Sequence, residues 1–191
     1  MTEPREIQPA AGDAGAEIGH ELLRRAFGTF ATGIAVIGAR SGDGKLVGMT
    51  ANSFTSVSLN PPLVLFCPAR SLAAFEIYSA ASHFSVSILP AHGEASSNRF
   101  ARTHTAKWEA EPHLVGATGT PLLSGALANF ECEVVARHDG GDHLIVVGRV
   151  VRAAATERGE PLVFFRSRYR ALDSRTRIVT PVSDPAFVAW E

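Results

Sequence analysis

A short polar stretch interrupts an apolar, β-type run early in the chain. Val47, Met49 and Ala51 alternate as the inward-facing residues of a strand do. The next large apolar residue is Phe54, so the inward face slips by one position across residues 50–53, Thr-Ala-Asn-Ser. This slip predicts a β-bulge, which would turn backbone N–H groups and small polar side chains toward a ligand. The alternative is an edge strand with a harmless polar stretch.

Two arginines occupy positions suited to an anion such as a phosphate. Arg70 and Ser71 follow residues 67–69 at the expected start of a helix, whose free N–H groups favour negative charge. Arg99 precedes Phe100 on a second expected helix, which pairs a cation with an aromatic face. The alternatives are an exposed arginine on a capped helix and a surface arginine beside a core phenylalanine.

An imidazole lies at the end of a predicted tight turn. His143 follows Gly-Gly-Asp and opens a strand, which would place it at the mouth of a β-barrel, near a bound ring or anion. The alternative is a solvated turn histidine. His138 flanks the same turn, but no HxH or HExxH spacing supplies further ligands, so we expect no metal site. The absence of GxGxxG, GxxxxGK[ST] and GxSxG motifs argues against Rossmann, P-loop and serine-hydrolase chemistry.

The elements that must position these residues follow from periodicity. Apolar residues at helical spacing predict a helix over 20–27 that ends at Gly28. Further short helices are expected over 71–80, with Ser71 as N-cap, and around 94–101, followed by an irregular loop to residue 125. The β-type runs are 31–39, 46–59, 63–67, 83–89, 127–138, 143–151 and 161–169.

The β-type runs and their turns predict an antiparallel barrel of some six strands with few helices. Residues 41–44 supply a hairpin turn, and the continuously apolar run 63–67 predicts a strand buried on both faces. The strongest hairpin signal is 127–151, where Phe130 and Glu131 begin opposite faces. We expect one domain over 20–171, a mobile arm over 1–19 and a weakly patterned tail over 172–191.

Composition narrows the class of protein further. The chain has 191 residues and a formal net charge of −1, with no Lys/Arg run, which argues against nucleic acid as a partner. Cys67 and Cys132 lie in apolar runs without CxxC spacing, which favours a reducing cytoplasm. No apolar run is long enough to span a bilayer, and residues 1–19 lack the apolar stretch of a signal peptide.

Taken together, these segments resemble the flavin reductase-like family of FMN-binding split barrels, the reductase components of two-component flavin monooxygenases. The matching strings cover roughly residues 22–171 in the family's order: FATGIAVIGA, GMTANSFTSVSLNPPLVLFC, FSVSIL, RFA, GTPLLSGALANFECEV, GGDHLIVVGRV and PLVFFRSRY. The resemblance implies a mainly β fold, a six-stranded antiparallel split β-barrel with Greek-key connections. It also implies a homodimer that passes a hydride from NADH or NADPH to FMN or FAD and releases the reduced flavin to a separate monooxygenase.

The resemblance also implies the residues of the site. His143 would lie near the nicotinamide, as the candidate catalytic residue, with Tyr169 close to the same pocket. The residues expected to bind the flavin are Val47, Gly48, Met49, Thr50, Ala51, Asn52, Ser53, Cys67, Pro68, Ala69, Arg70, Ser71, Ala73, Ala74, Arg99, Phe100 and Tyr169. Relatives often carry Ser or Thr in the first turn of the helix after CPA, where this chain reads RSLAAF, so phosphate contacts there would rest on Arg70, Ser71 and backbone.

Hydride transfer between two bound rings requires positioning more than an acid or base, because the cofactor carries the chemistry. The same pocket is also compatible with a protein that stores or carries flavin without turning over a nicotinamide. A β-barrel that binds no flavin is a second alternative, which visible absorption after incubation with FMN would test.

Overall fold

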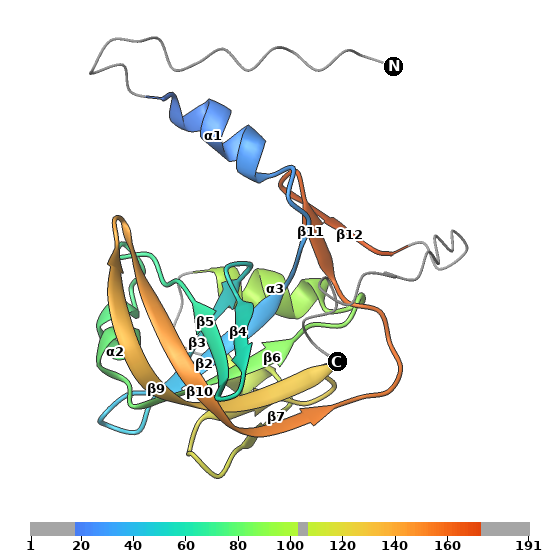
Figure 1. Cartoon of the computed structure of the whole chain (residues 1–191). Coiled ribbons are helices and arrows are strands. Elements are labelled where there is room, and N and C mark those ends of the chain that lie inside the picture. The colour runs from blue at the N-terminus through green and yellow to red at the C-terminus, as the bar shows by residue number, and fades with distance from the viewer. Residues whose placement is uncertain (1–17, 103–106, 173–191) are drawn as a thin grey trace.

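The computed structural model describes residues 18–102 and 107–172, and its largest element is a seven-stranded antiparallel sheet that curls into a barrel (Figure 1). The strand order is β3-β2-β6-β9-β10-β5-β4. The strands are β2 (Ala35–Arg40), β3 (Leu46–Ala51), β4 (Thr55–Leu59), β5 (Pro62–Phe66), β6 (His83–Ile88), β9 (Ala128–Gly140) and β10 (His143–Ala155). The mainly β class is therefore as predicted, although the sheet has seven strands.

The core forms around β6, which lies between β2 and β9 in the sheet. Both faces of β6 are covered, so Ser85 and Ser87 are as buried as Phe84 and Val86, and the alternation of this run does not mark a solvent face. The two serine hydroxyls are hydrogen-bonded, Ser85 to the Pro121 carbonyl and Ser87 to Asn129, which meets the requirement that a buried polar group find a partner.

The predicted bulge at residues 50–53 is instead the end of a strand. The register between β2 and β3 runs unbroken from Arg40↔Leu46 to Ala35↔Ala51, and the chain then leaves this edge and joins the opposite edge as β4. Residues 52–54 lie outside both ladders. The inward face slips there because the two halves of the run belong to different strands.

Two other expectations also need correction. In β5, Val64 and Phe66 are buried while Leu63 and Leu65 are only half-buried, so this strand is not enclosed on both faces. The helix expected from Ser71 begins at Phe75, as α2 (Phe75–Ala80), with Ala74 in the N-cap position. Ser71 does not cap it, because residues 70–74 form turns that meet the β9–β10 hairpin.

Smaller elements complete the described chain. The helices α1 (His20–Phe27) and α3 (Glu94–Ala101) agree with prediction. The expected loop to residue 125 contains a 3₁₀ turn, η1 (Trp108–Ala110), and a hairpin, β7 (His113–Val115) with β8 (Pro121–Leu123). The last run is a second hairpin, β11 (Val163–Phe165) with β12 (Arg168–Arg170), which pairs with β1 (Thr32–Gly33).

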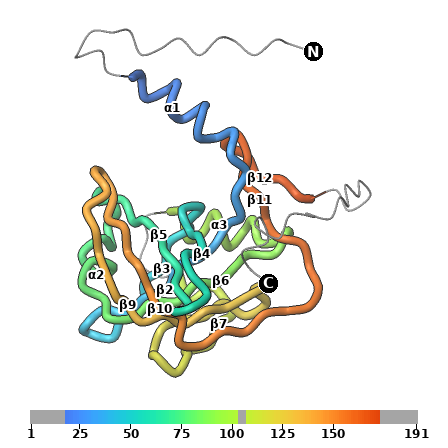
Figure 2. Tube along the Cα trace, in the orientation of Figure 1, coloured from blue at the N-terminus to red at the C-terminus, as the bar shows by residue number. Residues whose placement is uncertain are grey.

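Helix α1 stands away from the barrel, and the residue that follows it meets the β11–β12 turn, where the Arg166 N–H donates to the Gly28 carbonyl at 2.8 Å (Figure 2). None of its residues is buried. The arm and the tail expected over 1–19 and 172–191 lie almost entirely outside the described residues. In the part of the chain that the structure describes, no helix is long and apolar enough to cross a membrane.

Candidate functional site

The break between β3 and β4 is held in place by one serine. The Ser53 hydroxyl accepts the Cys67 N–H at 3.1 Å and lies 3.4 Å from the Cys67 carbonyl. This contact joins the chain after β3 to the chain after β5. It leaves Asn52 exposed, and neither Asn52 nor Phe54 has a ladder partner for its N–H. The site therefore presents backbone donors and a side-chain amide beside residues 67–69.

The β9–β10 hairpin meets the same segment from the other side. Ala69 forms an isolated β-bridge with His143, and the Leu144 N–H donates to the Pro68 carbonyl at 3.0 Å. The structure thus brings Ser53, residues 67–69 and His143 together from three distant parts of the sequence. The imidazole Nδ1 lies 2.7 Å from the Asp142 carboxylate. Because an ionised carboxylate can only accept, Nδ1 is the donor of this hydrogen bond, and in a neutral imidazole Nε2 is then an acceptor.

Arg70 fixes the turn of this hairpin and is not an open anion site. Its guanidinium donates to the Asp139 carboxylate at 2.7 Å and to the Gly141 carbonyl at 2.9 Å, and its backbone N–H donates to the Asp142 carbonyl at 2.8 Å. The hydrogen bond and charge of Arg70 hold the pKa of Asp139 below its usual value. The expected anion site at the start of α2 is not formed, since the helix begins five residues after Arg70.

Helix α3 is tethered to β3 and to β12. The Thr50 hydroxyl donates to the Ser97 carbonyl at 2.6 Å, and the hydroxyls of Ser97 and Tyr169 lie 2.8 Å apart. Tyr169 also donates to Asn98 at 3.2 Å. These contacts place Tyr169 against α3, whereas His143 lies beside Ala69, and no contact within the described chain joins Tyr169 to His143.

The pair Arg99 and Phe100 does not form the predicted cation-and-ring site. The Arg99 Nε donates to the Glu111 carboxylate at 2.8 Å. The Phe100 side chain is 1% exposed and packs against Trp108, with ring centroids 4.6 Å apart. The ring also lies against Gly48, where an added Cβ would come within 2.5 Å of it. Phe100 is therefore a core residue, and its ring occupies the space that a side chain at position 48 would need.

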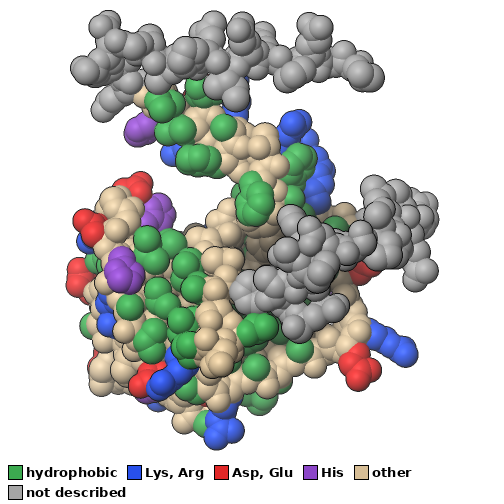
Figure 3. All heavy atoms as spheres, in the orientation of Figure 1, with side chains coloured by type: hydrophobic (Ala, Val, Ile, Leu, Met, Phe, Trp, Pro, Cys, Tyr) green, Lys and Arg blue, Asp and Glu red, His purple; other side chains and the backbone are tan. Residues whose placement is uncertain are grey.

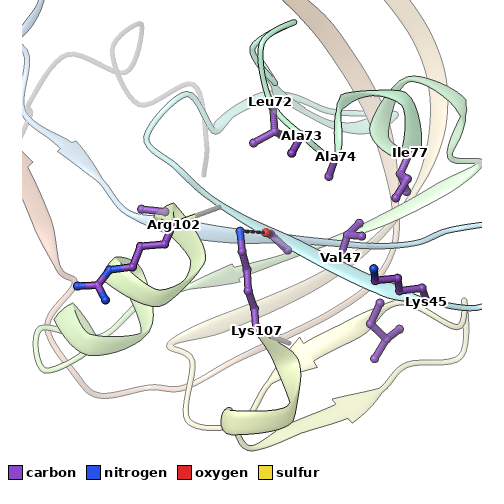
Figure 4. A pocket seen from close by; sticks show the side chains of 11 residues that line it. Lys45, Val47, Leu72, Ala73, Ala74, Ile77, Arg102 and Lys107 are labelled. Atoms are coloured by element: carbon purple, nitrogen blue, oxygen red, sulfur yellow. Dashed lines mark hydrogen bonds between the residues drawn. The ribbon is translucent and has the colours of Figure 1, made fainter. Parts of the chain in front are cut away.

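A pocket of about 240 Å³ lies beside β3, between the segment before α2 and the end of α3 (Figure 4). Four of the residues expected to bind cofactor line it: Val47, Gly48, Ala73 and Ala74. Seven more were not predicted: Lys45, Leu46, Leu72, Ile77, Ala101, Arg102 and Lys107. For most of these seven residues, the one sequence signal is their closeness in the chain to residues that were predicted. Lys107 has no such neighbour among the predicted residues, because the fold alone brings it to β3.

The remaining predicted residues lie on β3, directly after β5 and in the turn that follows Arg70. Met49 and Ala51 point into the barrel core, so they can offer a ligand only their backbone. Ser71 lies exposed in the turn after Arg70. Burial raises the pKa of the Cys67 thiol, which makes it less reactive than an exposed thiol. Among residues 18–102 and 107–172, no three His, Cys, Asp or Glu side chains gather as metal ligands.

This antiparallel barrel, in which the chain passes from one edge strand to the other at residues 52–54, has the fold of solved flavin reductases. The model of the flavin reductase like domain matches residues 27–173. The FMN reductase (NADH) SmoA of Agrobacterium fabrum is 45% identical over 146 residues, 74% of this chain and 80% of that protein. The chain therefore belongs to the flavin reductase-like family.

Two further relatives carry informative names. The reductase subunit HsaB of a flavin-dependent monooxygenase from Rhodococcus jostii is 32% identical over 162 residues, 85% of this chain and 83% of that protein. The solved NADH:FAD oxidoreductase SgcE6 of Streptomyces globisporus, in complex with NAD and FAD fragments, has a TM-score of 0.75 at 36% identity. That match covers 85% of this chain and 93% of SgcE6. The family and fold class predicted from the sequence are confirmed.

Proposed function

We propose that this chain is an NAD(P)H:flavin oxidoreductase that reduces FMN or FAD and releases the reduced flavin to a separate flavin-dependent monooxygenase. The observation that carries the proposal is the strand end at residues 52–54, pinned by Ser53 to Cys67 and flanked by His143. The names of SmoA, HsaB and SgcE6 support the flavin, the nicotinamide donor and the monooxygenase partner.

The donor set at the strand end fits the edge of an isoalloxazine ring. That edge has carbonyl oxygens and N5, which need hydrogen-bond donors, and N3–H, which needs an acceptor. Unpaired backbone N–H groups at 52–54 and the Asn52 amide offer both. A flavin held there would supply the hydride acceptor for the nicotinamide. The protein would bind the ring by main-chain atoms and leave one ring face open.

His143 is proposed as the residue that orients the nicotinamide. Its Nδ1 is held by Asp142, so its Nε2 can accept an N–H from the carboxamide of the donor. Replacing His143 with Ala should raise KM for the nicotinamide more than KM for the flavin, because the ring contacts at 52–54 remain. Steady-state kinetics with each substrate varied would test this, and an equal rise in both constants would remove His143 from the role.

We propose a homodimer as the working form. Large apolar side chains are exposed on α1 and along β4, β9 and β10, among them Leu22, Phe27, Leu59 and Val135. Figure 3 shows hydrophobic side chains gathered on the helix and on the barrel face below it. Apolar exposure on this scale favours burial against another protein surface, and a second copy supplies one. We also propose that the protein works in the cytoplasm, where free cysteines such as Cys67 and Cys132 stay reduced.

The test of the activity is oxidation of NADH or NADPH by the purified protein with FMN, FAD or no added flavin. We expect turnover that depends on added flavin and produces free reduced flavin. Tight flavin binding without consumption of either nicotinamide would show a flavin carrier instead. Comparing the turnover rates for each combination of the two nicotinamides and the two flavins gives the substrate preference.

A further inference from the structure

Positive charge is concentrated where α1 meets the β11–β12 turn. Residues 18–31 and 162–172 hold five arginines and one glutamate, a formal charge of +4 with histidine neutral, in a chain whose total is −1. Figure 3 shows basic side chains gathered beside the helix and the turn. Among these residues, the structure shows one ion pair, Arg25 with Glu21 at 4.0 Å, and both side chains are more than two thirds exposed. Because a pair so exposed contributes little, most of this charge is not compensated within the described chain.

A pocket of about 430 Å³ lies between the helix and the turn. Its lining is almost entirely polar, with three arginines against one carboxylate, which suits an anion. The residues that line it are Glu21, Arg24, Arg25, Gly28, Thr29, Arg166 and Ser167. The two elements are joined at the pocket by the hydrogen bond from the Arg166 N–H to the Gly28 carbonyl, so arginines far apart in the sequence lie around one space.

The pocket uses the polar side of α1, and its apolar side faces elsewhere. Residues 21, 24, 25 and 28 have the spacing of one side of a helix, and residues 22, 23, 26 and 27 have that of the other. Leu22 and Phe27, on the second side, are exposed residues that the proposed homodimer would bury. The side of α1 that carries the arginines is therefore distinct from the side that such an interface would use.

The β11–β12 turn carries two residues with side chains in a conformation that glycine favours. Arg166 and Ser167 have φ values of 50° and 60°, as a two-residue hairpin turn requires, but Asn and Gly are the usual residues there. Such a conformation costs free energy and is found where a side chain has a role. The Arg166 guanidinium lies over the Phe165 ring, 5.2 Å from its centroid, which orients it. In the described chain, no carboxylate is paired with it.

Helix α1 also connects this pocket with the hairpin that carries His143. The hydrogen bond and charge of His143 lower the pKa of Asp142, and the charge of His20, the first residue of α1, lowers it further. The start of α1 therefore lies near the tip of the β9–β10 hairpin. The eight residues of the helix span about 12 Å from there to the pocket. A donor with its nicotinamide at His143 that followed α1 would bring its phosphates toward the arginines.

We propose that the pocket between α1 and the β11–β12 turn binds a phosphate group of the nicotinamide donor, chiefly through Arg24 and Arg166. This inference rests on the proposed function, since the donor is the substrate of that reaction. Guanidinium groups from two elements can offer a phosphate several N–H donors in a fixed arrangement. NADH has a bridging diphosphate, and NADPH has a 2′-phosphate as well, so the same chemistry is available from two sources.

The first test is calorimetric titration of the full chain with inorganic pyrophosphate. Arg166→Gly removes the guanidinium and supplies the residue that a φ of 50° favours, so the fold should unfold at no lower temperature than wild type. We expect about three- to tenfold weaker binding of pyrophosphate, the worth of an exposed contact between a cation and a phosphate. Arg168→Gln is the matched control, because it removes a cation from the same hairpin but outside the pocket, and binding should stay unchanged.

The second test is steady-state kinetics with NADH and with NADPH, using Arg166→Gly and Arg24→Gln. A diphosphate in the pocket predicts that KM rises about three- to tenfold for both donors, and a 2′-phosphate predicts the rise for NADPH alone, with little change in kcat. Unchanged KM for both donors in both variants would overturn the inference and leave the proposed function standing. A wild type that binds pyrophosphate but oxidises neither donor would instead defeat the proposed function.

Discussion

At the scale of single residues, Gly48 shows how the core limits the wall of the site. Gly48→Ala would place a Cβ 2.5 Å from the Phe100 ring and 3.0 Å from the Trp108 indole nitrogen. Both rings are buried and cannot move aside, so we expect a loss of about 1–3 kcal/mol in the free energy of unfolding. Gly42→Ala, which meets nothing within 4 Å, should change stability by less than about 0.5 kcal/mol. Urea denaturation measures both, and equal stability of the two variants would contradict the packing.

Glu131 gives the fold a dependence on pH at the same scale. Burial acts to raise its pKa, but hydrogen bonds from the Thr118 N–H and hydroxyl, both at 2.7 Å, outweigh burial and hold the pKa below its usual value. A carboxyl with a depressed folded pKa stabilises the fold above its unfolded pKa, and that stability is lost as pH falls through the folded value. Denaturation at several pH values should show a steeper acid loss in wild type than in Glu131→Gln. Parallel curves of stability against pH for the two proteins would contradict this role of Glu131.

At the scale of elements, Arg70 connects the turn before α2 with the β9–β10 hairpin that carries His143. Arg70→Ala removes the contacts to Asp139 and Gly141, so the hairpin tip should become more mobile. We expect a several-fold rise in KM for the nicotinamide, about two- to tenfold, with little change in flavin affinity. Arg149→Ala, which breaks a comparable pair with Glu133 elsewhere on the hairpin, should leave both constants unchanged.

Elements whose signals are local could be predicted from the sequence, and those set by distant contacts could not. Alternation and turn residues were enough for the β9–β10 hairpin, and helical spacing was enough for α1 and α3. Ser71 looked like an N-cap, but Arg70 holds that segment on the distant hairpin, so the helix starts later. The same limit applies to the candidate site: the sequence predicts residues 50–53 and 67–69 as part of it, while the burial of Phe100 and the approach of Lys107 to β3 follow only from the fold.

At the scale of the whole molecule, the exposed apolar surface of α1 makes the oligomeric state testable. Leu22→Asp with Phe27→Asp places charge on the face that a second copy would bury. We expect wild type to sediment as a dimer and the double variant as a monomer with weaker flavin binding. Leu114→Asp, which changes a side chain 67% exposed on β7, should remain dimeric. A wild type that is monomeric at micromolar concentration would refute the dimer.

Residues 52–54 have one more consequence, because they connect β3 and β4, the two free margins of the seven-stranded sheet. A flavin bound there would contact the ends of both edge strands, and its binding free energy would oppose the separation of these strands from the sheet. Adding FMN should therefore slow amide hydrogen exchange in β3 and β4 together, to a similar degree. The β7–β8 hairpin, which belongs to a separate sheet, should exchange at its original rate.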